Sequence, residues 1–82
     1  MSDYNSTLLE IVNLLGAKWS IEDYQLAGMG WAAKITSDGS LFTLHSERGW
    51  IDIYLGNYQD QQILGCKNTV KEVVKVVSDN VT

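Results

Sequence analysis

The chain has 82 residues, enough for one small domain around a single core. Its hydrophobic fraction of 45% is typical of a folded globular chain and too high for a disordered one. Six Lys and Arg residues against ten Asp and Glu residues give a formal net charge of −4 at pH 7. Nucleic-acid binding depends on many contacts from Lys and Arg to phosphate, so this excess of acidic residues argues against a nucleic-acid-binding protein.

Several other classes of protein lack their sequence signals here. The single cysteine, Cys66, cannot form an internal disulfide, and one histidine offers no cluster at metal-ligand spacing. The first nine residues lack the basic and apolar segments of a signal peptide, and no apolar stretch approaches the roughly 20 residues that span a bilayer. We therefore expect a cytoplasmic single domain over residues 1–82, with no metal, no cofactor and no membrane contact.

A helix is predicted from about residue 6 to residue 16. Thr7 and Glu10 have the spacing of a capping box, with Asn5 or Ser6 as alternative N-caps. A glycine directly after the last apolar residue suits the end of the helix. The apolar residues at helical spacing are Leu8, Ile11, Val12 and Leu15.

Between residues 29 and 55 the apolar period changes to two, which predicts three antiparallel strands. Asp38-Gly39 is a strong signal for a two-residue hairpin turn, and Arg48-Gly49 provides the next turn. Residues 57–62 have the composition of a loop, and Ile63 and Leu64 form either a short fourth strand or a plug under the helices. The Gly28-Met29-Gly30 segment is interpreted as a bend that leads into the first strand.

These turns fix the register of the strands, because a slip of one residue would move every side chain to the other face. The predicted pairs are Ile35 with Phe42, Ala33 with Leu44, Lys34 with Thr43, Leu44 with Ile53, Phe42 with Leu55, and His45 with Asp52. The predicted core face carries Met29, Trp31, Ala33, Ile35, Phe42, Leu44, Ile51, Ile53 and Leu55. The opposite face, which two helices cannot also cover, carries Ala32, Lys34, Thr43, His45, Glu47, Trp50, Asp52 and Tyr54.

A second helix is predicted near the C-terminus. Thr69 and Glu72 repeat the capping-box spacing, with Asn68 as the alternative cap, and the competing interpretation is a strand over 70–77. The apolar face of this helix consists of Val70, Val73, Val74, Val77 and Val81. The predicted fold is α+β with two layers, in which an antiparallel three-stranded meander, with a possible short fourth strand, packs against both helices in the order αβββα.

The predicted order, with Gly65-Cys66-Lys67 ahead of a Lys-containing helix, is similar in outline to double-stranded RNA-binding domains. Those domains bridge phosphates with a cluster of lysines at the start of the second helix. Here Lys67 and Lys71 are separated by three uncharged residues in an acidic chain. The resemblance therefore implies a shared topology without RNA binding.

The open face gathers the side chains that are candidates for function. Trp50 and Tyr54 are of the types most enriched at protein interfaces, and His45, Glu47 and Asp52 surround them in the predicted sheet. The alternative is that the loop over 57–62 covers Trp50 and closes a second small core. His45, oriented by Asp52, could act as a catalytic base only if a nucleophile lay beside it, and the sequence indicates none. A pair on the surface of the sheet is therefore the simpler interpretation.

Cys66 has two interpretations from sequence. A thiol near a helix N-terminus can have a lowered pKa and be reactive. A lone cysteine between Leu64 and Val70 can also be a small buried hydrophobe.

The stretch Ser46-Glu47-Arg48-Gly49-Trp50, followed by alternating residues to Gly56, resembles segments of small bacterial toxin-immunity proteins. Such proteins, and phage inhibitors of defence nucleases, are short acidic domains without enzymatic activity that occlude a basic site. Between Ile21 and Gly65, six acidic residues stand against Lys34 and Arg48 as the basic ones. This acidic middle of the chain and the resemblance lead to one hypothesis: a non-enzymatic module that neutralises a basic protein, a nuclease or a toxin. Its expected contacts are Trp50 and Tyr54 as anchors, with His45 beside them and Glu47, Asp52 and Asp60 as charge complements. The alternatives are a self-associating domain that forms a homodimer and a degenerate fold of the RNA-binding type.

Overall fold

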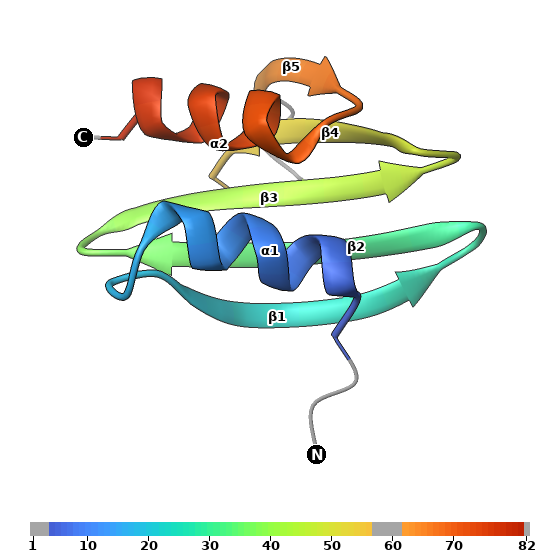
Figure 1. The fold of residues 1–82 in the computed structure, drawn as a ribbon, viewed down its shortest axis with the longest axis horizontal. Coiled ribbons are helices and arrows are strands. Elements are labelled where there is room, and N and C mark those ends of the chain that lie inside the picture. Colours follow the sequence, from blue (N-terminus) through green and yellow to red (C-terminus); the bar gives the residue numbers. More distant parts are fainter. Residues whose placement is uncertain (1–3, 57–61, 82) are drawn as a thin grey trace.

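The computed structural model describes residues 4–56 and 62–81. Five antiparallel strands form one sheet in chain order, and the two helices lie side by side on one face of it (Figure 1). The fold is α+β with two layers, as predicted, but the sheet has more strands than the three or four expected. The elements are α1 (Ser6–Leu15), β1 (Ser20–Ala27), β2 (Gly30–Ser37), β3 (Ser40–Glu47), β4 (Trp50–Leu55), β5 (Gln62–Lys67) and α2 (Val70–Asp79).

Both helices begin at side-chain caps. The side chain of Asn5 accepts a hydrogen bond from the Thr7 amide at 2.8 Å, so the cap of α1 is Asn5 and the capping role predicted for Thr7 is wrong. At α2, Thr69 Oγ1 accepts from the Glu72 amide at 3.3 Å and donates to the Glu72 carboxylate at 2.9 Å. The predicted capping box of α2 is confirmed, and the strand alternative for residues 70–77 is wrong.

The three central strands follow the prediction in register as well as in extent. Asp38 and Arg48 each have a positive φ, of 45° and 54°, and each is followed by a glycine with a positive φ, as two-residue hairpin turns require. All six predicted pairs are present: Ile35–Phe42, Ala33–Leu44, Lys34–Thr43, Leu44–Ile53, Phe42–Leu55 and His45–Asp52.

The two outer strands are where the prediction falls short. The residues of β1 form a strand that the sequence did not predict, and Gly28-Met29 forms its turn to β2 rather than a simple bend. Ile63 and Leu64 belong to β5, so the strand alternative is right and the plug is wrong. Residues 57–61 of the predicted loop lie outside the described residues. The five-stranded sheet also departs from the αβββα order on which the likeness to RNA-binding domains rested.

The core lies between the sheet and the two helices. Phe42 at its centre is completely buried, and its ring centroid lies 5.7 Å from that of Trp19. Met29 was predicted to face this core but is 75% exposed, because it occupies the turn after β1. Leu55 is only partly buried. The buried apolar residues are Leu8, Ile11, Trp31, Ala33, Ile35, Phe42, Leu44, Ile51, Ile53, Val73 and Val77.

Gly30 permits an unusually close approach of β2 to β3. A Cβ atom at this position would overlap the carbonyl oxygen of Ser46 and lie 2.7 Å from its carbonyl carbon. The same atom would lie 3.2 Å from the Cα of Glu47. Only glycine therefore fits here without moving the backbone of one strand.

A candidate interaction surface on the open face of the sheet

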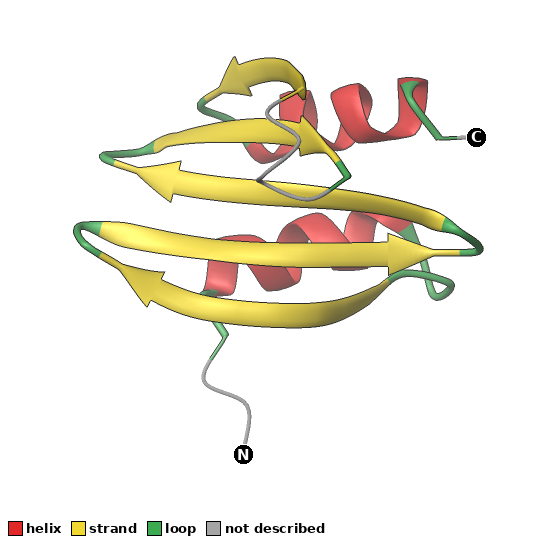
Figure 2. Ribbon diagram, turned by 180° about the vertical axis from the view of Figure 1, so that it is seen from behind, coloured by secondary structure: helices red, strands yellow, loops and turns green. Residues whose placement is uncertain are grey.

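The face of the sheet that points away from both helices carries the candidate site (Figure 2). We call it the open face. Side chains alternate between the two faces along a strand, and partners across strands share a face, so the register assigns its members. They include Asp23, Gln25, Ala32, Lys34, Thr43, His45, Glu47, Trp50, Asp52, Tyr54, Ile63 and Cys66.

Trp50 is the largest apolar side chain of the open face. It is 51% exposed, so it does not close a second core in the way the alternative interpretation required. Tyr54 lies four residues further along β4 and is half-buried, with Asp52 between it and Trp50. Ile63 on β5 is the cross-strand partner of Tyr54 and is 53% exposed. It extends the apolar surface beyond the two aromatic residues that the sequence indicated.

A row of polar side chains crosses three strands beside Trp50. His45 Nδ1 lies 3.9 Å from Asp52 Oδ2, as the predicted pairing of these residues implies. On the other side of Asp52, the hydrogen bond with Cys66 raises the pKa of the thiol above its ordinary value, and desolvation and then the charge of the carboxylate act in the same direction. The carboxylate therefore favours the protonated thiol over the thiolate that a nucleophile needs.

This position corrects both interpretations of Cys66. The residue is exposed on the open face, so it is not a buried hydrophobe. It also lies within β5 rather than at the start of α2, and its pKa is raised instead of lowered. The sequence could not show this, because the pairing of Cys66 with Asp52 depends on the register of β5.

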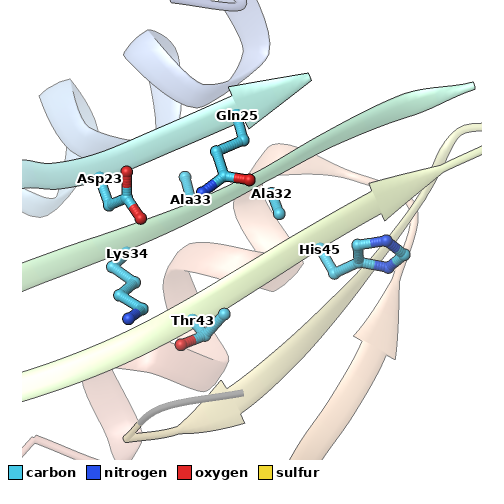
Figure 3. A pocket seen from close by; sticks show the side chains of 7 residues that line it. All are labelled: Asp23, Gln25, Ala32, Ala33, Lys34, Thr43 and His45. Atoms are coloured by element: carbon cyan, nitrogen blue, oxygen red, sulfur yellow. The ribbon is translucent and has the colours of Figure 1, made fainter. Parts of the chain in front are cut away.

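A shallow hollow of about 260 Å³ lies over β2, next to this row (Figure 3). Its cause is the small side chain of Ala32, which lies between the longer side chains of Gln25 on β1 and His45 on β3. The lining residues are Asp23, Gln25, Ala32, Ala33, Lys34, Thr43 and His45.

Thr43 ties the chain after β4 to the middle of the open face. It is only 2% exposed, and its hydroxyl donates a hydrogen bond of 2.7 Å to the carbonyl oxygen of Gly56. The Gly56 amide in turn donates to the carbonyl oxygen of Leu41 at 2.8 Å. The chain that leaves β4 therefore turns back towards β3 at this point.

The charges of the open face are mostly negative. Asp23, Glu47 and Asp52 lie on it, against Lys34 as the basic residue among the described positions of this face. Asp60, which the sequence analysis placed among the charge complements, lies outside the described residues. The predicted group of His45, Glu47, Trp50, Asp52 and Tyr54 does share one face of two neighbouring strands.

No family model, curated protein or solved structure matches this chain. Within residues 4–56 and 62–81, no helix is long and apolar enough to cross a membrane. The same residues contain no group of three or more His, Cys, Asp or Glu side chains placed to hold a metal ion.

Proposed function

We propose that this chain is a small, non-enzymatic protein-binding module that holds and neutralises a basic protein with its open face. The observation that carries the proposal is the half-exposed indole of Trp50 on a sheet face that neither helix covers. Tryptophan and tyrosine bury a large area at interfaces and are enriched among residues that dominate binding energy. Ile63 adds apolar area beside Tyr54, as expected at the centre of an interface.

The charge of the same face supports a basic partner. Glu47 is the cross-strand partner of Trp50, and Asp52 is the next residue of β4 on the same face. Carboxylates in such positions attract a cationic surface and accelerate association. The partner class that we propose is a nuclease or a toxin, whose neutralisation would make this an immunity or anti-defence inhibitor. The segment that resembles immunity proteins comprises the end of β3, the turn and β4, and it carries Trp50, Glu47 and Asp52 together.

Self-association is the second candidate function. The outermost strands, β1 and β5, each pair with one neighbour in the sheet, and a strand at a sheet edge can pair with a second copy across a two-fold axis. Glu22 and Asp23 lie on β1, and charges on an edge strand oppose such pairing. For this reason we favour the inhibitor function over self-association as a homodimer.

The test is affinity capture from a cell lysate with immobilised wild-type protein, at low and then at moderate salt. Trp50→Ala is the informative variant. Leu14→Ala is its matched control, because Leu14 is 54% exposed on α1 in the other layer. We expect one stoichiometric basic partner that is retained by the control, lost with Trp50→Ala and weakened by salt.

Three results would contradict the proposal. Capture that is unaffected by Trp50→Ala would show that the partner does not bind to the open face through Trp50. A wild-type protein without a partner that sediments as a dimer would favour self-association. Tight binding of duplex RNA at physiological salt would favour the degenerate RNA-binding fold.

A further inference from the structure

We propose that Glu47 and Trp50 together form a receptor for an arginine side chain of the basic partner. This inference rests on the proposed function, because it names the group of the partner that the open face recognises. The receptor lies at the end of the β3–β4 hairpin, where the acidic and aromatic features of the open face meet.

The register places these two side chains next to each other. Glu47 and Trp50 are direct cross-strand partners on either side of the two-residue turn Arg48-Gly49. Partners of this kind have Cβ atoms about 4.5–5.5 Å apart and project from the same face. Both side chains are exposed, so a group from a partner can reach the indole ring and the carboxylate at once.

The carboxylate of Glu47 is available for a new ion pair. Among residues 4–56 and 62–81, the recorded ion pairs are His45–Asp52 and Lys75–Asp79, and neither involves Glu47. Lys34 of the same face pairs with Thr43, four residues along β3 from Glu47. Lys34 therefore does not neutralise Glu47, and Arg48 in the adjacent turn forms no ion pair with it among these residues.

Arginine fits this pair better than lysine does. A guanidinium is planar and weakly hydrated, so it stacks on an indole ring while its N–H groups donate to a carboxylate. The ammonium of lysine is a strongly hydrated point charge that makes no planar stack. Asp52 follows Trp50 by two residues on β4, so it also lies on the open face and adds negative potential there.

The experiment uses two capped tripeptides as probes, Gly-Arg-Gly and Gly-Lys-Gly, titrated into the full-length protein. Binding is followed by the NMR signals of the three tryptophan indole N–H groups, and Trp50→Phe identifies the signal of Trp50. We expect the arginine peptide to shift this signal with an affinity about three-fold higher than that of the lysine peptide, as for an exposed cation–π contact. Glu47→Gln should weaken the arginine peptide, whereas Glu10→Gln, which removes an exposed acid on α1, should not.

The outcomes separate this inference from the proposed function. Equal affinity for both peptides, or no effect of Glu47→Gln, would overturn the arginine receptor even if Trp50→Ala still abolishes capture of the partner. Peptide binding as expected, with capture that does not depend on Trp50, would overturn the proposed function. A wild-type dimer that Arg48→Ala dissociates would assign the receptor to Arg48 of a second copy, and would overturn a foreign partner as its occupant.

Discussion

Replacing Gly30 by alanine tests how closely β2 and β3 approach at the end of the sheet that carries Glu47. The added Cβ would lie 2.7 Å from the carbonyl carbon of Ser46, whereas non-bonded carbon atoms prefer about 3.5–4.0 Å. One strand must therefore move by about 1 Å, against a sheet that is paired on both sides of β2 and of β3. Overpacking of this kind costs about 1–3 kcal/mol, which we expect to lower the midpoint of thermal unfolding by about 5–20 °C.

Gly65→Ala is the matched control for this substitution. Gly65 is also a strand glycine, but a Cβ there would meet its nearest heavy atoms, in the side chains of Lys67 and Val76, at an ordinary 3.8 Å. We expect it to unfold within about 1 kcal/mol of the wild type, or to be slightly more stable. Thermal unfolding followed by circular dichroism compares the two variants. Equal midpoints for Gly30→Ala and Gly65→Ala would refute the close approach at Gly30.

Three further predictions concern the helix cap, the open face and the thiol. Thr69→Ala removes both hydrogen bonds of the cap of α2 and should cost about 1 kcal/mol in thermal unfolding, which Thr69→Ser should largely restore. Thr43→Val deletes the hydrogen bond to Gly56 and should cost about 1 kcal/mol in urea unfolding, and no loss would contradict the path of the chain after β4. Asp52→Asn removes the carboxylate whose hydrogen bond, and to a smaller extent whose charge, raises the pKa of Cys66, so a larger thiolate fraction at pH 8 should make alkylation by iodoacetamide faster, while Asp23→Asn should leave the rate unchanged. An unchanged rate in Asp52→Asn would show that the carboxylate does not hold the thiol proton.

The central hairpins were predictable because their sequence signals are local and agree with one another. Asp38-Gly39 and Arg48-Gly49 fix two-residue turns, and each turn determines the register of the strands that it joins. The period-two pattern then selects the face of every residue between them. For this reason the sequence predicts that Trp50 and Glu47 lie on the same face of the sheet.

β1 escaped prediction, and β5 was predicted only as one of two alternatives, because a bulge interrupts the pattern in each pairing. In β1 the register shifts between Ile21 and Asp23, so the apolar residues Ile21 and Tyr24 are three positions apart instead of two. In the pairing of β4 with β5 the register shifts between Ile53 and Tyr54. The sequence signal that could have revealed β1 is the glycine at position 28, because glycine is favoured at the first position of a two-residue hairpin turn. In the structure Gly28 takes this position with a φ of 55°.

The candidate site was predictable only as far as those hairpins extend. Trp50, Asp52 and His45 lie on strands whose register the turns determine, so their shared face follows from the sequence. Ile63 and Cys66 join the same face through β5, and no local signal fixes the register of that strand. The exposure of Trp50 also depends on the chain packed around it, which periodicity does not describe.

We propose that the open face, through Trp50, is the surface that binds a basic partner. Calorimetry of the purified partner with the wild type, Trp50→Ala and Leu14→Ala measures this directly. We expect Trp50→Ala to cost about 2 kcal/mol or more, an increase in Kd of about 30-fold or more, while Leu14→Ala binds like the wild type. Unchanged affinity in Trp50→Ala would show that the open face does not bind the partner through Trp50, and a loss confined to Leu14→Ala would place the interface on the helical layer.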